Sequence, residues 1–347
     1  MPLDRIYVTR HGVMFYSPSH PRIPLPNRQP FHPELTRRYL LQHRLNWTIN
    51  LDNGTYHSVY PTPTGIPVDP TLTGPGVRQS QELAAHLNSD EFSPKPCRVY
   101  SSPFYRCLQT IQPTVEALKA RQERERKACV DLDVRMENGL GEWFGSSSFF
   151  THPAPAPPET LRILFPTLLN SQYEPHVYPS PNGETIAILH DRIATTLQTI
   201  IAQVDAELDE FERDNPAEQK KSRAILICTH AAPLIAIGRA LTGDMPEDTC
   251  VEDFRPFTAS LSTFVRKRRE AGGGGGEASG EELFSGKGAP QWQGGIGVGG
   301  GWICVGNGDC GFLSGGEERG WHFNGEEDFD TMPAAVLTDS EGSPAKL

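Results

Sequence analysis

The stretch RIYVTRHG, Arg5–Gly12, opens the chain with a short β-rich run that ends in an Arg-His-Gly triplet. The residues of Arg5–Thr9 are of the types enriched in strands, and they predict a buried strand. A histidine at the end of a strand can be a nucleophile, a metal ligand or an ordinary loop residue. The role of His11 therefore depends on what the other strands bring to the same edge of the sheet.

Two later runs repeat this arrangement. Arg98–Ser101 predicts a second strand, and Ala224–Thr229 is apolar throughout, as expected of a central parallel strand. Apolar residues recur at helical spacing in four further segments: 76–87, 106–118, 184–214 and 233–242. Strands that alternate with helices predict an α/β fold, a three-layer α/β/α sandwich around a mostly parallel central sheet.

Four side chains follow the ends of these strands. Arg10 and His11 follow the first strand, Arg106 the second and His230 the third, and the carboxyl ends of parallel strands meet at one edge of a sheet. Two guanidinium groups can bind a phosphoryl group, and a neutral imidazole can attack phosphorus. No carboxylate cluster suited to a metal accompanies them, so we expect chemistry without a metal or another cofactor.

These residues lie in a set of motifs that resembles the histidine phosphatase superfamily, whose fold is phosphoglycerate mutase-like. The matching text is RHG at 10–12, LTGPG at 72–76, SSPFYRCLQT at 101–110, PNGET at 181–185 and LICTHAAPL at 226–234. RHG alone is a weak signal, but the ordered set spans residues 4–265. The resemblance implies a phosphohistidine on His11, a phosphate pocket of Arg10, Arg106 and His230, and a carboxylic acid that protonates the leaving oxygen.

Two carboxylates could be that acid, because both lie in the stretch MENGLGEWFG. Family members often read E-x-x-x-G-x-W-x-G here. Glu137, Gly141, Trp143 and Gly145 match this spacing, so we expect Glu137 to be the catalytic acid. Glu142 is then a solvated residue or one at the edge of the substrate.

The sequence after the RHG triplet departs from the family pattern. In the eukaryotic branch that includes ubiquitin-associated SH3 phosphatases and the 55 kDa subunit of transcription factor C, RHG is usually followed by Arg and then Asn-Trp. Here HRLNW appears only at 43–47, and deleting Val13–Gln42 would restore RHGHRLNW and bring Arg44 into the phosphate pocket. Val codons begin with GT and Gln can be CAG, so we interpret 13–42 as a translated intron. A genuine disordered loop is the alternative.

We divide the chain into three parts. Residues 1–269 form the phosphatase domain, the Gly-rich segment 270–301 is a flexible loop, and 302–347 hold a terminal strand and an acidic, aromatic tail. From residue 271 onward twelve Asp and Glu face three Lys and Arg, so most of the net charge of −11 lies there. Such a tail favours a protein partner and argues against direct nucleic-acid binding.

The cysteines and the apolar runs indicate where the protein works. The seven cysteines are odd in number and fit no zinc pattern, and no apolar run reaches membrane-spanning length. We therefore expect an intracellular protein, cytoplasmic, nuclear or both, with no membrane association.

Two functions follow from this reading. The first is a metal-free phosphatase that hydrolyses phosphomonoesters, either small molecules or phosphopeptides, through a phosphohistidine on His11. The alternative is a non-catalytic scaffold subunit of a complex like the RNA polymerase III transcription factor C. The complete set of site residues favours the enzyme, and the tail favours a complex.

Overall fold

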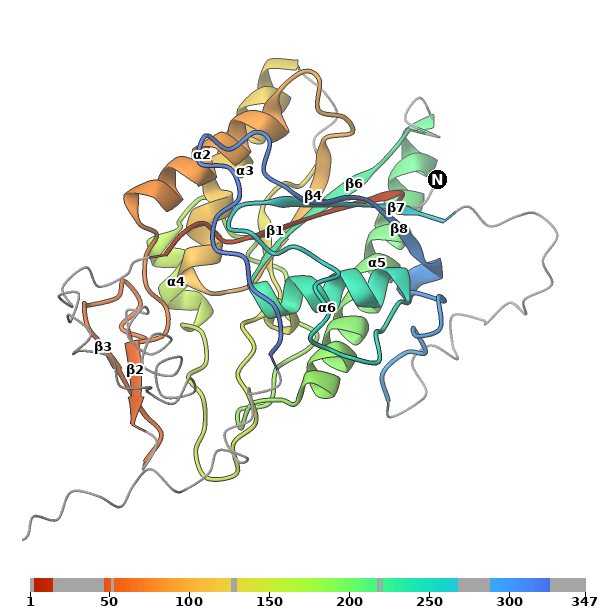
Figure 1. The fold of residues 1–347 in the computed structure, drawn as a ribbon. Coiled ribbons are helices and arrows are strands. Elements are labelled where there is room, and N and C mark those ends of the chain that lie inside the picture. The colour runs from red at the N-terminus through yellow and green to blue at the C-terminus, as the bar shows by residue number, and fades with distance from the viewer. Residues whose placement is uncertain are drawn as a thin grey trace, which may run out of the picture.

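In the computed structural model, the described residues are 3–14, 47–50, 53–125, 130–216, 219, 221–267 and 288–324. Their main feature is a six-stranded sheet with the order β5-β4-β6-β1-β7-β8 (Figure 1). The strands are β1 Arg5–Arg10, β4 Pro96–Ser101, β5 Val134–Met136, β6 Ala224–Thr229, β7 Leu261–Arg266 and β8 Trp302–Asp309. The first four of these pair in parallel, whereas β7 and β8 are antiparallel to their neighbours.

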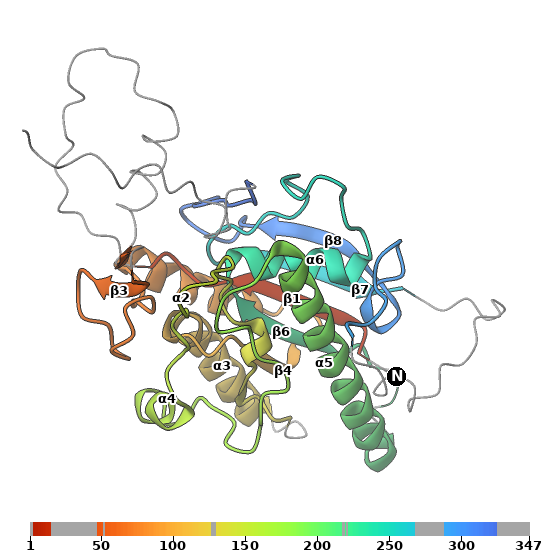
Figure 2. The same cartoon turned by 90° about the horizontal axis from the view of Figure 1, so that it is seen from below.

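Helices cover both faces of this sheet (Figures 1 and 2). One face packs against α2 (Gly74–Asn88) and α3 (Tyr105–Glu125), and the other packs against α5 (Ile186–Asp214) and α6 (Ala231–Thr242). The predicted α/β sandwich with a mostly parallel sheet is therefore confirmed. The remaining elements are α4 Pro158–Leu164, the short 3-10 helices η1 Asn138–Leu140 and η4 Val298–Gly300, and a hairpin of β2 Trp47–Asn50 and β3 Thr55–Ser58.

The C-terminal part of the chain differs from the expectation. Strand β8 pairs with β7, so the sheet continues past residue 269. Within the stretch expected to be a featureless loop, Trp292 and Val298 are buried, and the Trp292 ring stacks on His190 of α5 with centroids 6.0 Å apart. The expectation was wrong for residues 288–301, because two apolar side chains among the glycines are enough to pack the segment against the helices.

The structure does not describe most of the expected insert, Arg44 or the end of the acidic tail. Residues 15–42, Arg44 and 325–347 lie outside the described residues. Among the described helices, none combines the length and the apolar character that a membrane span requires.

Candidate active site

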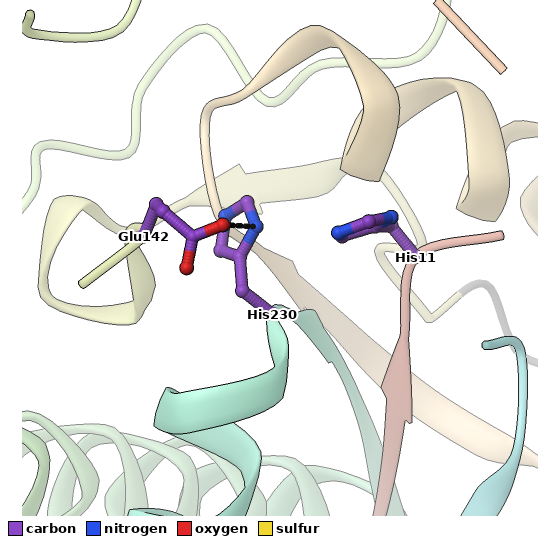
Figure 3. Close-up of side chains that lie close together, drawn as sticks. All are labelled: His11, Glu142 and His230. Atoms are coloured by element: carbon purple, nitrogen blue, oxygen red, sulfur yellow. Dashed lines mark ion pairs between the residues drawn. The ribbon is translucent and has the colours of Figure 1, made fainter. Parts of the chain in front are cut away.

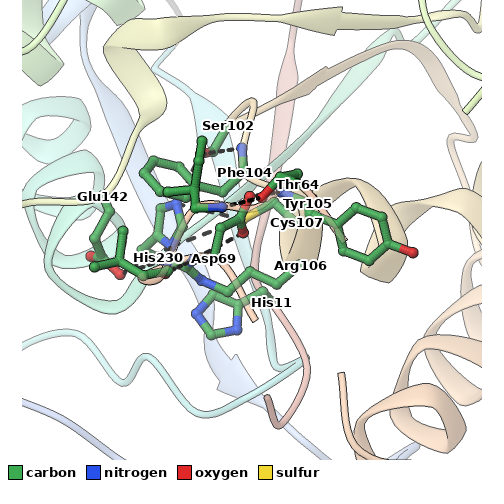
Figure 4. Close-up of polar contacts among 12 residues, drawn as sticks. His11, Thr64, Asp69, Ser102, Phe104, Tyr105, Arg106, Cys107, Glu142 and His230 are labelled. Carbon is green, nitrogen blue, oxygen red and sulfur yellow. Dashed lines mark hydrogen bonds and ion pairs between the residues drawn. The ribbon is translucent and has the colours of Figure 1, made fainter. Parts of the chain in front are cut away.

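The carboxyl ends of β1, β4 and β6 bring three predicted side chains together (Figures 3 and 4). His11 follows β1, His230 follows β6, and Arg106 lies in the first turn of α3 beyond β4. The two imidazole centroids are 5.3 Å apart, and all three side chains are at most 2% exposed. The edge-of-sheet argument thus predicted the right neighbours.

His11 is held as a neutral imidazole. Its Nδ1 lies 2.8 Å from the carbonyl oxygen of Gly12, and because a carbonyl can only accept, Nδ1 carries the proton and Nε2 the lone pair. Burial lowers the pKa of His11 well below its usual range, and the positive charges of Arg106, His230 and Arg10 lower it further. Nε2 is therefore a nucleophile at any ordinary pH.

Close backbone packing fixes the loop that carries His11. The Gly12 amide donates to Thr110 Oγ1 at 3.0 Å, and the Val13 amide donates to Gln79 Oε1 at 3.0 Å. A Cβ on Gly76, at the start of α2, would lie 2.1 Å from the Val13 carbonyl oxygen. Gly76, the second glycine of the LTGPG motif, is thus needed so that α2 can approach the loop after His11.

Arg106 is the buried cation of the site. Its Nη1 donates to Val68 O at 2.9 Å and to Asp69 Oδ1 at 3.2 Å, and its Nη2 lies 2.9 Å from Glu142 Oε2 (Figure 4). Its Nε is buried and has no hydrogen-bond partner among the described residues. A buried donor without an acceptor is costly, so this N–H is suited to an incoming phosphoryl oxygen.

Glu142 and His230 form a charged pair beside Arg106. His230 Nδ1 is 3.2 Å from Glu142 Oε2 (Figure 3), and its Nε2 is 2.8 Å from Ser102 Oγ (Figure 4). Burial would raise the pKa of Glu142, but the charges of His230 and Arg106 outweigh it and hold that pKa far below the usual range. Burial and the charge of Arg106 lower the pKa of His230, but Cys107 and the Glu142 carboxylate together raise it above its usual value. These shifts favour a protonated His230 opposite an ionised Glu142.

Glu137, the expected acid, lies elsewhere. Its carboxylate is fully buried and accepts hydrogen bonds from the Gly139 amide, the Tyr173 hydroxyl and the amides of His176 and Val177, at 2.7–3.2 Å. It caps η1 and anchors the 173–177 segment. The placement expected from the spacing is therefore corrected, and Glu142 is the carboxylate beside the two histidines.

The two other predicted arginines have different outcomes. Arg10 lies close enough to His11 to lower its pKa, and its Nη1 donates to the carbonyl oxygens of Pro256 at 2.7 Å and Arg319 at 2.6 Å. These carbonyls orient its guanidinium. Arg44 lies outside the described residues, so its place in a phosphate pocket stays a prediction.

A metal ion is geometrically conceivable here. One ligand atom each of His11, Glu142 and His230 lies within 4.8 Å of the others. The guanidinium of Arg106, 2.9 Å from the Glu142 carboxylate, places a positive charge next to where a dication would sit. The residues present thus suit an anion better than a metal.

Sequence reasoning missed several residues of the site. Glu142 carried a usable signal, since it lies in the same motif as Glu137, but the spacing rule favoured Glu137, which lies away from the two histidines. Ser102 belongs to the SSPFYRCLQT motif, but nothing in the motif indicates its contact with His230. Asp69, which holds Arg106 and the Tyr105 amide, is 37 residues before Arg106 and gave no local signal.

Comparisons with known proteins identify the family. The model of the histidine phosphatase superfamily (branch 1) matches residues 62–271 and so begins after the RHG triplet. The transcription factor tau 55 kDa subunit of Saccharomyces cerevisiae is 30% identical over 295 residues, which cover 82% of this chain and 58% of the yeast protein. The chain thus spans little more than half the length of that relative.

Solved structures with a similar chain path include phosphatases. Ecdysone phosphate phosphatase from Bombix mori, in complex with tungstate, is 16% identical, with 81% of this chain and 99% of that chain covered and a TM-score of 0.41. Mycobacterial glucosyl-3-phosphoglycerate phosphatase is 15% identical, with 88% and 98% covered and a TM-score of 0.41. The family match covers more than half of the chain, and the chain belongs to the histidine phosphatase superfamily, branch 1.

Proposed function

We propose that this protein is a phosphatase that hydrolyses phosphomonoesters through a phosphohistidine on His11. One observation carries the proposal: a neutral His11, with its lone pair on Nε2, lies beside a buried guanidinium that has one N–H without an acceptor among the described residues. A nucleophile next to an anion site is the arrangement that phosphoryl transfer requires.

In the first half of the reaction, Arg106 and Arg10 bind the phosphoryl oxygens and His11 Nε2 attacks phosphorus. The P–O ester bond breaks as the N–P bond forms, and Glu142 gives a proton to the leaving oxygen. In the second half, the Glu142 carboxylate takes a proton from a water molecule that attacks the phosphohistidine. Glu142 passes this proton back to His230 Nδ1, 3.2 Å away, and inorganic phosphate leaves, so that His11, Glu142 and His230 all return to their starting states.

The proton that Glu142 gives up has a source within the site. Glu142 is ionised in the resting pair, but a phosphoryl dianion bound beside it would raise its pKa, because like charges oppose each other in a buried site. His230 Nδ1 is 3.2 Å away and can supply the proton directly. His230 and Glu142 thus share one proton that either can hold, and Arg106 keeps its positive charge throughout.

A second function is supported by a different observation. Because the chain is 30% identical to a transcription factor subunit, we infer that it also works within a nuclear protein complex, with the acidic tail as a contact for a protein partner. This role needs no turnover. The two functions are therefore separable by measuring activity.

The test is phosphate release from a panel of phosphomonoesters, with the full chain and with a chain lacking Val13–Gln42, before and after exhaustive treatment with EDTA. We expect release that survives chelation and that falls at least about 100-fold in Arg106→Gln. Arg78→Gln is the matched control, since its side chain is 55% exposed on α2. Absence of release from both chains, or loss on chelation with recovery on added Mg²⁺ or Zn²⁺, would refute the proposal.

A further inference from the structure

A pocket of ≈ 130 Å³ opens beside Glu142. Its walls are mostly apolar, with the rings of Phe104, Phe144 and Tyr178 and prolines of the 153–155 and 179–181 segments. An apolar cavity of about 150 Å³ holds one benzene molecule, so this pocket has room for about one six-carbon group. Nothing in the phosphoryl-transfer chemistry described above uses this space.

The pocket adjoins the reacting groups. Glu142 lies in its wall and also in the cluster whose ligand atoms are within 4.8 Å of one another. Phe104, another wall residue, packs edge-on against His230 and lies under the Arg106 guanidinium, 4.6 Å from the ring centroid. A phosphoryl group on Arg106 with its ester oxygen toward Glu142 would therefore direct its alcohol part into this pocket.

The described lining of the pocket offers no cation to a second anion. No Lys or Arg is among the described residues that line it, and its two carboxylates are already paired, Glu142 with Arg106 and Glu184 with Arg192. His152 has Nδ1 2.7 Å from the Tyr56 hydroxyl and Nε2 2.9 Å from the Gly145 carbonyl oxygen, and burial lowers its pKa. It is neutral, so a second phosphate or a carboxylate would find no cation among the described residues of the lining.

The walls of the pocket are braced against each other. Phe144 stacks on His152 with centroids 4.9 Å apart, and the His152 amide donates to the Pro181 carbonyl oxygen at 2.7 Å. A Cβ on Gly183, which has φ +79°, would lie 2.1 Å from the Gly145 carbonyl oxygen. The pocket is therefore built before a ligand arrives, and an apolar group can enter it without ordering the walls.

We propose that this pocket binds the leaving alcohol, so that the substrates are phosphomonoesters of uncharged, apolar alcohols with about six carbon atoms next to the phosphate. Sugar bisphosphates, nucleotides and phosphoglycerates are then poor substrates, because their second anionic group would enter an apolar pocket whose described walls carry no Lys or Arg to receive it. This inference rests on the proposed phosphatase function and names the substrate class of the same site.

The test compares cyclohexylmethyl phosphate with ethyl phosphate. Both leaving groups are primary alcohols of similar acidity, so a difference in kcat/KM reports binding of the ring and not the chemistry. We expect the cyclohexylmethyl ester to be favoured about 10- to 100-fold, as partial burial of several CH₂ groups implies, and 3-phosphoglycerate to be worse than both. Phe144→Ala should reduce the preference, whereas Phe149→Ala, whose ring is 55% exposed and does not line the pocket, should retain it.

Binding of the matching phosphonates, measured by calorimetry, separates the two levels of the proposal because phosphonates are not turned over. Tighter binding of cyclohexylmethylphosphonate without turnover of any ester would uphold the pocket and refute the phosphatase. Turnover of ethyl phosphate with equal binding of both phosphonates would uphold the phosphatase and overturn the pocket. Preferred turnover of 3-phosphoglycerate would overturn the pocket as well.

Discussion

Glu137 and Glu142 lie five positions apart in one motif, yet their carboxylates have opposite surroundings. Glu137 is surrounded by backbone amides and the Tyr173 hydroxyl, which donate hydrogen bonds that fix the chain. Glu142 faces Arg106 and His230, whose charges change the energy of its proton. Residue type and spacing could not separate the two, because the difference arises from segments that are distant in the sequence.

The matched variants Glu142→Gln and Glu137→Gln test this division. A leaving alkoxide must be protonated and p-nitrophenolate need not be, so Glu142→Gln should lower kcat about 10²–10⁴-fold on alkyl phosphates and far less on p-nitrophenyl phosphate. Glu137→Gln should instead lower the free energy of unfolding by about 1–3 kcal/mol, since it weakens charge-assisted hydrogen bonds. A loss that depends on the leaving group in Glu137→Gln alone would make Glu137 the acid after all.

The strands that carry the site could be predicted from the sequence, whereas the packing of residues 288–301 against α5 could not. The interior residues of β1 and all residues of β6 are apolar or β-branched, and a histidine follows each strand. Both strands, and the edge of the sheet that they share, could therefore be predicted. The segment before β8 is Gly-rich, and its packing depends on Trp292 meeting His190, about a hundred residues earlier. Composition describes such a segment as a linker because a single tertiary contact leaves no periodic pattern.

That contact makes the packing of α5 sensitive to pH. His190 is buried, its Nδ1 donates to the Ile186 carbonyl oxygen at 2.6 Å, and its Nε2 has no hydrogen-bond partner among the described residues. Burial lowers the pKa of His190 to about 4. A proton on Nε2 would be a buried charge without an acceptor, so the neutral form belongs to the folded state.

His190→Phe keeps a ring against Trp292 and removes the titration. Because the unfolded chain has the ordinary pKa of 6.5 at this side chain, the unfolded state binds more protons between that value and about 4, and stability falls as the pH falls through this window. The unfolding free energy of the wild type should therefore drop by about 3 kcal/mol more than that of the variant. Denaturant unfolding at a series of pH values measures this, and a constant difference between the two proteins would contradict it.

The C-terminal part of the chain reaches back across the fold to the first strand. The two described non-glycine residues with positive φ, Ala259 at 54° and Arg319 at 57°, both contact Arg10, through the Ala259 amide and the Arg319 carbonyl. Nearby, Glu318 Oε2 accepts from Gln79 of α2 at 2.8 Å. Backbone held in a costly conformation on both sides of Arg10 indicates that the tail helps to set the site, which the motifs alone did not predict.

Two substitutions of Arg319 remove the same side chain and differ in the backbone that they allow. Glycine adopts positive φ without strain, whereas valine strongly resists it. Arg319→Gly should therefore keep the carbonyl on Arg10, and Arg319→Val should displace it and weaken orthovanadate binding about 10-fold or more, as loss of one charge-assisted hydrogen bond implies. Equal vanadate affinities in the two variants would mean that the tail does not orient Arg10.

Capture of the phosphoenzyme tests the role of His11 most directly. The protein is mixed with a phosphomonoester labelled with ³²P, quenched in alkali, and digested to locate the label. We predict one labelled histidine, in the peptide that contains Arg10–Gly12, with label that is stable in alkali, lost in acid, absent from His11→Ala and retained in His57→Ala, a control on the exposed face of β3. Labelling of His11→Ala at the level of the wild type would contradict the phosphohistidine mechanism.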